Sequence, residues 1–389
     1  MTKRKTIPES EFVLQEGCIL AKLLTLLTVA GEVPVSAIPL LGNYKSYMRV
    51  IQKARKVCKY CNAKTQERYT VRLLTIVGKD KQRAVRMLSG AEPILDWLGL
   101  LEDYQQLHIN TFTGNQGNRE RIHRSAEGYA MMLSAGAEIV PSRLPKLQRE
   151  VIQNTFENKQ GYYGRKQIKE ASFLKIDKSA YTRIIGVLFG DRKAFAVYNT
   201  RGEPLRWSVD GERTACVYLK ILSNMNANLY NPRSAILFGE NAGVAIKTLE
   251  NHEKIKKNET LPYNHLYFIP LNENGIRQLR ILLLENWHEE LLSVLFPEEI
   301  RIQQFDMCDA MWQGKHVCVY MHGDLAKLAW IRRFGPQIDA QFEVVCFPFQ
   351  ADFVKAYLGN LATVKVIALD VVEKALGIEN GQMKTRKNS

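Results

Sequence analysis

Basic side chains are concentrated in one short part of this chain, residues 43–86. That segment holds thirteen Lys or Arg residues and two acids, a net charge of +11, while the whole chain of 389 residues carries +14. Because like charges repel when they are packed together, a block of this kind indicates a polyanion that neutralises it. The pI of about 9.3 agrees with a nucleic-acid partner. The chemistry predicted for this segment is binding to a phosphate backbone.

A second group of residues could bind a metal ion. Asp210 and Glu212 lie in W-S-V-D-G-E-R, between a predicted strand and a predicted helix. Metal-dependent nucleases place carboxylates at such junctions, because Mg²⁺ needs two or more hard oxygen ligands beside the scissile phosphate. However, Asp-Gly is equally a turn, and an acid is favoured at the start of a helix by the helix dipole. We favour the structural explanation here, and Asp306, Asp309 and Asp370 are poorer metal candidates still.

Other catalytic motifs are not found in the sequence. It has no G-x-G-x-x-G or G-x-x-x-x-G-K-[ST] phosphate loop, no H-E-x-x-H and no G-x-S-x-G. Cys58 and Cys61 form a C-x-x-C, but structural zinc needs four ligands and no second pair follows, so we predict no metal there. Tyr162 and Tyr163 have the residue type of a strand-transfer nucleophile, with no activating residue nearby in sequence.

Helical patterns must position the basic block. Apolar residues recur at helical spacing over 20–27, a shorter apolar group follows Pro34, and 44–55 divides into two faces. Helix, short helix, turn and basic helix is the order of a helix-turn-helix. The two faces of the last helix are Tyr44, Met48, Ile51 and Ala54 on the apolar side and Lys45, Arg49, Lys53 and Lys56 on the basic side.

Two strands are predicted after the basic helix. Residues 56–60 and 69–77 flank a polar tip at 62–68, and a hairpin in this place completes a winged helix. We expect the basic helix to enter the major groove of double-stranded DNA, while Lys64 and Arg68 contact the adjacent backbone. The predicted DNA-binding residues are Lys45, Arg49, Lys53, Lys56, Lys64, Arg68 and Arg72.

The remainder of the chain predicts a second domain. Residues 79–137 have the pattern of further helices, 184–189 and 194–198 predict a hairpin, and after residue 235 strands alternate with helices. This indicates an α/β domain with a mixed sheet, and α+β overall. The predicted division is a winged-helix domain with a helical extension at 1–140, a connector at 141–165, the α/β domain at 166–379 and a disordered basic tail at 380–389.

The order of these parts, together with several phrases, resembles a known family. The phrases are R-I-H-R-S-A-E-G-Y-A-M-M, Q-I-K-E, S-A-Y-T-R-I-I-G-V-L-F, A-F-A-V-Y-N-T and W-S-V-D-G-E-R-T, all within residues 15–230. They resemble replication-relaxation proteins of plasmids and of integrative and conjugative elements. The resemblance implies an amino-terminal winged helix, a restriction-endonuclease-like carboxy-terminal domain, and a part in replication or conjugative mobilisation of a mobile genetic element.

One position departs from the family. Its acidic signature looks like Glu-x-Asp, and this chain has Ser208 two residues before Asp210, so the first carboxylate is missing. The loss of one ligand weakens a magnesium site. We therefore expect no enzyme activity and no cofactor. A nuclease would require Mg²⁺ bound by Asp210 and Glu212.

The sequence leaves four functions open. The first is a DNA-binding protein of a mobile element, with other replication or transfer proteins as partners. The second is a transcriptional regulator whose α/β domain is a sensor or oligomerisation module, acting as a homodimer. The third is a magnesium-dependent nuclease or relaxase, and the fourth is a module whose basic face binds an acidic protein.

Cysteine usage and hydropathy indicate the compartment. Seven scattered cysteines argue against a disulfide framework and for a reducing environment. The apolar runs are too short to span a bilayer. We expect a cytoplasmic protein without a membrane partner.

Overall fold

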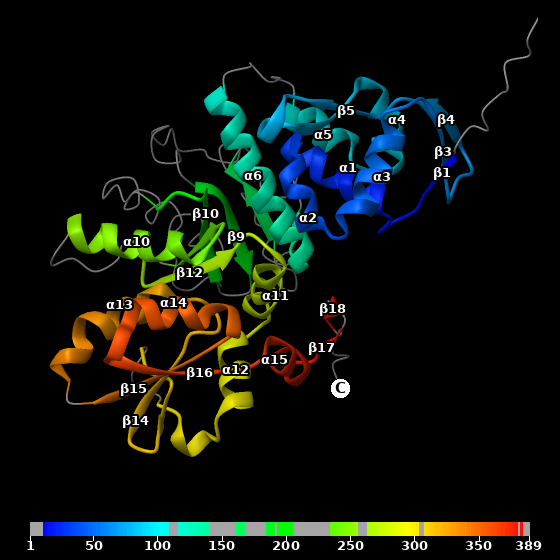
Figure 1. The fold of residues 1–389 in the computed structure, drawn as a ribbon. Helices are drawn as coiled ribbons and strands as arrows, with labels where there is room; N and C mark the ends of the chain where they lie inside the picture. Colours follow the sequence, from blue (N-terminus) through cyan, green and yellow to red (C-terminus); the bar gives the residue numbers. More distant parts are fainter. Residues whose placement is uncertain are drawn as a thin grey trace, which may run out of the picture. The chain divides into compact units, whose positions relative to one another are not determined.

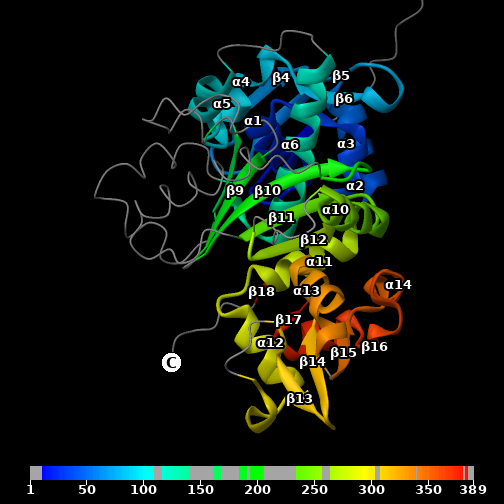
Figure 2. The same ribbon diagram turned by 90° about the vertical axis from the view of Figure 1, so that its left-hand side faces the viewer.

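The computed structural model describes residues 11–108, 116–139, 161–165, 167, 184–190, 193–205, 234–255, 263–302, 307–338, 340–379 and 382–383. The chain divides into two compact units, unit 1 at residues 1–130 and unit 2 at 131–389. Both are mixed α/β structures (Figures 1 and 2). Among the described residues, no helix combines the length and the apolar character needed to cross a membrane.

Helix α1 (Ile19–Ala30) supplies much of the core of unit 1. It begins at Cys18, whose Sγ accepts a hydrogen bond from Ala21 N, and ends at Gly31, which has a φ of 72°. It packs against α3 (Tyr44–Ala54) and α5 (Leu101–His108). The leucine repeat thus forms the predicted helix, and its fully buried members are Leu23, Leu24, Leu26 and Leu27.

A sheet of three described strands joins the parts before and after α3. The strands are β2 (Glu32–Pro34), β5 (Leu74–Val77) and β6 (Ala84–Met87), all antiparallel, in the order β2-β6-β5. A 3-10 turn, η1 (Val35–Ala37), and the short helix α2 (Ile38–Leu41) lead from β2 to α3, as predicted. The hairpin of β5 and β6 closes around a second 3-10 turn, η2 (Asp80–Gln82).

A second sheet of unit 1 has the order β1-β3-β4. It consists of β1 (Glu11–Leu14), β3 (Cys58–Asn62) and β4 (Arg68–Val71), with β1 parallel and β4 antiparallel to β3. The predicted hairpin around residues 62–68 is therefore confirmed. The single strand predicted over 69–77 is wrong, because the chain leaves this sheet after Val71 and enters the other sheet at Leu74.

The helices α4 (Glu92–Trp97), α5 and α6 (Gln116–Ala135) follow. The further helices predicted within residues 79–137 are confirmed by these three. The prediction that 79–137 is helical throughout is wrong, because residues 84–87 form the strand β6, which pairs with β2. The border between the two units falls within α6.

The first sheet of unit 2 has the order β12-β11-β10-β9-β8-β7. β8, β9 and β10 are antiparallel, whereas β10, β11 and β12 are parallel, so the sheet is mixed. The predicted 184–198 hairpin is confirmed as β9 and β10. The strands are β7 (Glu138–Ile139), β8 (Gly161–Gly164), β9 (Ile184–Gly190), β10 (Lys193–Arg201), β11 (Ser234–Gly239) and β12 (His265–Pro270).

The second sheet of unit 2 has the order β13-β14-β15-β16, in which β14, β15 and β16 are parallel. One hydrophobic core runs from the first sheet through α10, α13 and α14 to this second sheet (Figures 1 and 2). The strands are β13 (Ala310–Trp312), β14 (Lys315–Val319), β15 (Gln341–Cys346) and β16 (Ala362–Val366). The helices are α10 (Ala242–Ile255), α11 (Glu273–Leu282), α12 (Trp287–Leu295), α13 (Leu325–Phe334), α14 (Pro348–Leu358) and α15 (Leu369–Ala375).

Candidate nucleic-acid interface

The exposed face of α3 is basic. The helix begins at Asn43, whose Oδ1 accepts a hydrogen bond from Ser46 N at 3.0 Å, an N-cap that satisfies an otherwise free amide. No acidic residue occurs along α3. Tyr47, Ile51 and Ala54 are buried, and the residues opposite them are exposed. We call this exposed set, Lys45, Arg49, Gln52 and Lys56, the basic face of α3.

The apolar stripe of α3 differs from the prediction. Tyr44 was expected on the buried side, but 45% of its surface is exposed. Tyr47 fills the core position instead, because Tyr47, Ile51 and Ala54 follow the spacing of four and three residues that aligns side chains on one helix face. Tyr44 is therefore a partly exposed aromatic residue, next to Lys45 in the sequence.

Lys53 is not on the basic face of α3. Its side chain is half-buried, with Nζ 4.1 Å above the ring of Phe12 and 3.4 Å from the carbonyl oxygen of Glu11. Both partners belong to β1, which packs against the end of α3. The ammonium group of Lys53 therefore attaches β1 to the helix, and its contact with DNA stays a prediction.

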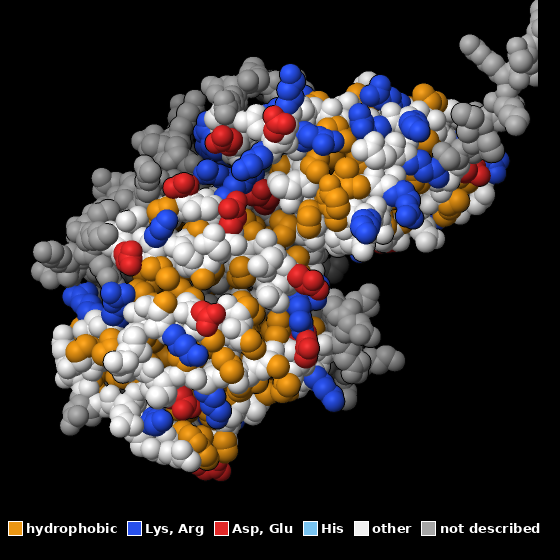
Figure 3. All heavy atoms as spheres, viewed as in Figure 1, with side chains coloured by type: hydrophobic (Ala, Val, Ile, Leu, Met, Phe, Trp, Pro, Cys, Tyr) orange, Lys and Arg blue, Asp and Glu red, His pale blue; other side chains and the backbone are white. Residues whose placement is uncertain are grey.

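The remaining predicted residues are exposed. Lys64 lies at the tip of the β3–β4 hairpin, Arg68 and Arg72 lie on or just after β4, and Lys56 follows α3. Arg68 forms an ion pair with Glu11 at 3.4 Å, but both side chains are largely in solvent, where such pairs contribute little. Figure 3 shows Lys and Arg side chains gathered over the visible face of unit 1.

A further basic group lies on the β5–β6 hairpin. Lys79, Lys81 and Arg83 are all exposed at its tip, where Gly78 turns the chain with a φ of 79°. These residues belong to the basic segment 43–86, but they were not among the predicted DNA-binding residues, because 79–137 was expected to be helical. The sequence does contain a signal for a turn here, because Gly78 and the charged residues after it lie between two apolar segments.

A buried carboxylate lies behind this hairpin. Glu32 is fully buried, and its Oε1 accepts from Arg119 Nε at 2.6 Å while Oε2 accepts from Arg86 Nε at 2.8 Å. His123 Nε2 lies 2.6 Å from Oε1. Burial by itself raises the pKa of Glu32, but these three hydrogen bonds outweigh it and lower the pKa to about 2. The carboxylate joins β2, β6 and α6.

His123 is accordingly a buried residue of this cluster. It lies among the polar residues of the first half of α6, yet it is only 3% exposed. A sequence signal existed, because Arg119 and His123 are four residues apart and so lie on one helix face. Their common partner, Glu32, is 91 residues from His123 in sequence.

The other candidate residues are not assembled into a site. Cys58 and Cys61 are three residues apart on β3, so their side chains point to opposite faces and cannot bind one metal ion together. Tyr162 and Tyr163 are fully buried in β8. Asp210 and Glu212 lie outside the described residues. Within the part of the chain that the structure describes, no group of three or more His, Cys, Asp or Glu could hold a metal ion.

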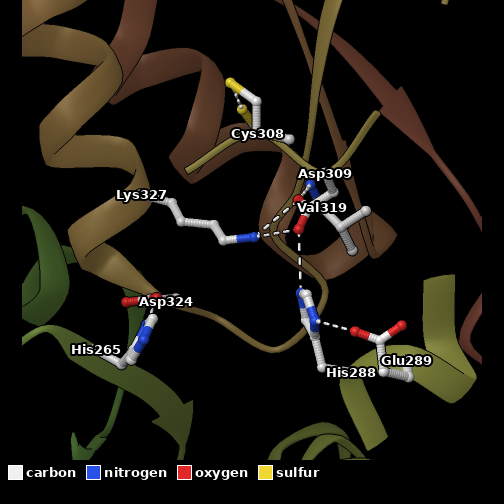
Figure 4. A network of polar contacts seen from close by, with 9 residues as sticks. His265, His288, Glu289, Cys308, Asp309, Val319, Asp324 and Lys327 are labelled. Carbon is white, nitrogen blue, oxygen red and sulfur yellow. Dashed lines mark hydrogen bonds and ion pairs between the residues drawn. The ribbon is translucent and has the colours of Figure 1, made fainter. Parts of the chain in front are cut away.

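Unit 2 contains a buried ion pair that the sequence did not reveal (Figure 4). Lys327 Nζ lies 2.7 Å from both carboxylate oxygens of Asp309, and both side chains are 3% exposed. The carboxylate also accepts from Val319 N at 2.6 Å and lies 3.1 Å from His288 Nε2. Burial raises the pKa of Asp309, but Lys327 and these hydrogen bonds lower it overall. Asp309 is thus neutralised by a cation of the protein itself.

A histidine and an aspartate are paired nearby in unit 2 (Figure 4). Asp324 Oδ2 lies 2.8 Å from His265 Nδ1, while Oδ1 accepts from Leu266 N and Ala326 N, both at 3.0 Å. These bonds attach the start of α13 to β12. Both aspartates therefore link secondary-structure elements.

Comparison of the chain with protein-family models, with curated proteins and with solved structures finds no match. The function is therefore inferred from the chemistry of the described residues.

Proposed function

We propose that unit 1 binds double-stranded DNA as a winged helix, with the basic face of α3 in the major groove. Two arrangements support this. The first is the order α1, β2, α2, α3, a helix-turn-helix, which is followed, after the strands β3 and β4, by the hairpin of β5 and β6. The second is the sheet order β2-β6-β5, in which that hairpin pairs with the strand after the first helix. We call the β5–β6 hairpin the proposed wing.

The observation that carries the proposal is the composition of α3. Lys45 and Arg49 stand exposed on the side opposite the core, and the helix has no acidic residue that could neutralise them. A major groove admits an α-helix, and Arg and Lys are the side chains that bind guanine edges and phosphates there. The proposed wing adds Lys79, Lys81 and Arg83 for contacts to the backbone.

The test is a salt titration of duplex binding. Wild type should bind random-sequence duplex DNA with an affinity that falls as salt rises, because binding releases counterions. Lys45→Glu/Arg49→Glu should weaken binding by about tenfold or more and lower the salt slope by about two. Fluorescence anisotropy with a labelled duplex measures both quantities.

A matched control is available in unit 2. Lys365→Glu/Lys374→Glu makes the same change of net charge at two exposed positions. It should bind DNA as wild type does, apart from a small change in the overall field. Equal losses in both variants would show that net charge alone attracts DNA. Unchanged binding by Lys45→Glu/Arg49→Glu would contradict the placement of α3 in the groove.

The wider role is proposed from the sequence resemblance alone. A protein acting in replication or mobilisation of a mobile element should prefer DNA of that element. We expect tighter binding to duplex from the neighbourhood of its own gene than to random duplex of the same length and salt concentration. Equal affinity for the two would remove this role and leave DNA binding itself intact.

A further inference from the structure

The sheet β1-β3-β4 is additional to the sheet that carries the proposed wing. β3 and β4 occur in the chain between α3 and β5, so they interrupt the path from the helix to the proposed wing. β1 precedes α1 and pairs in parallel with β3. The basic charge of residues 56–72 therefore belongs to the sheet β1-β3-β4. The proposed roles of α3 and of the proposed wing do not explain this charge.

One face of this sheet is aromatic and packs against other parts of unit 1, with Tyr69 on the edge strand β4 still 45% exposed. The rings of Phe12 and Tyr60 stack with centroids 5.3 Å apart. Tyr69 is opposite Tyr60 in the ladder, and its ring lies 5.2 Å from that of Trp97 in α4. Lys53 of α3 covers Phe12. This face packs inward, so the other face of the sheet is directed outward.

The outward face is basic. The ladder register places Lys59 and Arg68 on this face, and exposed Arg72 follows β4. Glu11 is the acid of the described strands, and it lies beside Arg68. Because that pair is exposed, it is readily exchanged for a contact with a phosphate. The face therefore retains an excess of positive charge.

The tip of the β3–β4 hairpin is held in a fixed conformation. Asn62 is almost fully buried, and its Oδ1 accepts from Lys64 N at 2.8 Å and from Thr65 N at 3.3 Å. Its backbone N donates to Glu67 O at 2.9 Å. The turn presents Lys64 to solvent on an ordered backbone, which lowers the entropic cost of binding a ligand.

The sheet is attached to the carboxyl end of α3. Leu73 N donates to Ala54 O at 3.2 Å, and Cys58 Sγ donates to Lys53 O at 3.1 Å. The proposed wing lies at a different place, next to η1. There Val35 N donates to a carbonyl of the hairpin. The two basic hairpins thus adjoin different parts of the helix-turn-helix.

We propose that the basic face of the sheet β1-β3-β4 binds the sugar-phosphate backbone of duplex DNA flanking the site contacted by α3. This inference rests on the proposed function, since α3 must lie in the groove for the sheet to reach the flanking duplex. The partner is a duplex that extends past that site on the side of the carboxyl end of α3. Helix, wing and sheet together contact a longer stretch of DNA than helix and wing do.

The experiment compares duplexes of about one and about three helical turns. Lys64→Glu/Arg68→Glu should lose affinity on the long duplex, with the salt slope lowered by about two. On the short duplex, at low salt, it should bind as wild type does, because the flanking phosphates are missing. Lys64→Gln/Arg68→Gln, which removes charge without adding repulsion, should show a smaller loss in the same direction. Lys365→Glu/Lys374→Glu serves again as control.

The outcomes separate this inference from the proposed function. In one outcome, Lys64→Glu/Arg68→Glu binds the long duplex as wild type does, while Lys45→Glu/Arg49→Glu loses binding. The sheet then does not bind flanking DNA, and the proposed binding of α3 in the groove still stands. Equal losses on the short and the long duplex also overturn the assignment to flanking DNA. Wild-type binding by Lys45→Glu/Arg49→Glu removes the proposed function, and this inference with it.

Discussion

The guanidinium group of Arg119 occupies the space into which a side chain at Gly78 would extend. A Cβ atom on Gly78 would lie 2.7 Å from Nη2 and 2.8 Å from Nη1 of Arg119, and in contact with Gln82 O. Gly78 begins the turn of the proposed wing, and Arg119 is held by Glu32. Helix α6 therefore packs against the turn of the proposed wing through one side chain.

We expect Gly78→Ala to destabilise the protein by more than backbone strain alone. Its φ of 79° is left-handed, a conformation that costs a residue with a Cβ about 1–2 kcal/mol. The clash with Gln82 O and Arg119 should add about 1–3 kcal/mol, as overpacking does. Gly17→Ala is the matched control, with a φ of 78° and open space around it. Urea denaturation of both variants measures their free energies of unfolding. Equal losses of stability in the two variants would mean that Arg119 moves aside freely.

Glu32→Gln should lower stability at neutral pH and make it less dependent on pH. The folded-state pKa of Glu32 is about 2, below its usual value of 4.5, so the ionised carboxylate stabilises the fold fully above about pH 4.5. That contribution, on the order of 3 kcal/mol, is lost as pH falls toward 2. Denaturant unfolding at several pH values should show the gap between wild type and variant closing below about pH 4.5. A gap that stays constant with pH would contradict the assignment to Glu32.

Local features of the sequence determined the elements that were predicted correctly. Helix α3 begins at the N-cap Asn43, and the strands β9 and β10 adjoin a Gly-Asp pair in the sequence. The alternation of strand and helix after residue 235 reflects parallel pairing, which buries both faces of a strand and so makes its residues apolar. Each of these signals lies within a few residues of the element that it defines.

Pairings between distant residues explain the errors. β6 was missed because its strand character depends on pairing with β2, where Arg86 is opposite Glu32. The contacts of Lys53 were not predicted, because its partner in β1 lies 42 residues earlier in the chain. The ion pair of Asp309 was not predicted, because nothing in its local sequence identifies Lys327, 18 residues away, as its partner. A single sequence contains no local signal for such contacts.

Removing the cap of α3 should affect both stability and DNA binding. In Asn43→Ala the amide of Ser46 loses its acceptor, which costs about 1 kcal/mol for a helix N-cap. The first turn carries Lys45, so fraying there should also weaken binding to duplex DNA. Ser46→Ala is the control, because the bond uses the backbone of Ser46 and not its hydroxyl group. Thermal unfolding measures the change in stability, and fluorescence anisotropy measures the change in affinity for duplex DNA. Equal losses of stability and affinity in Ser46→Ala would contradict the role of the Asn43 side chain.

Lys327→Met should be among the most damaging single substitutions in unit 2. It leaves the Asp309 carboxylate buried without a cation, which typically costs about 3–5 kcal/mol. Replacing both partners, as in Asp309→Leu/Lys327→Met, should cost less, because no charge then remains buried. Lys365→Met, at an exposed position, should change stability by less than about 0.5 kcal/mol.

The pH dependence of Lys327→Met identifies the group responsible. In wild type Lys327 lowers the pKa of Asp309, so the ionised pair stabilises the fold at neutral pH and loses this effect as pH falls. In the variant, burial without the cation raises that pKa, so the penalty should shrink as the carboxylate becomes protonated. The stability difference between wild type and variant should therefore narrow on acidification. Two results together would contradict this explanation: a stability difference that does not depend on pH, and a double variant Asp309→Leu/Lys327→Met that is as unstable as Lys327→Met. The loss of stability would then come from lost packing of the lysine stem and not from an unpaired carboxylate.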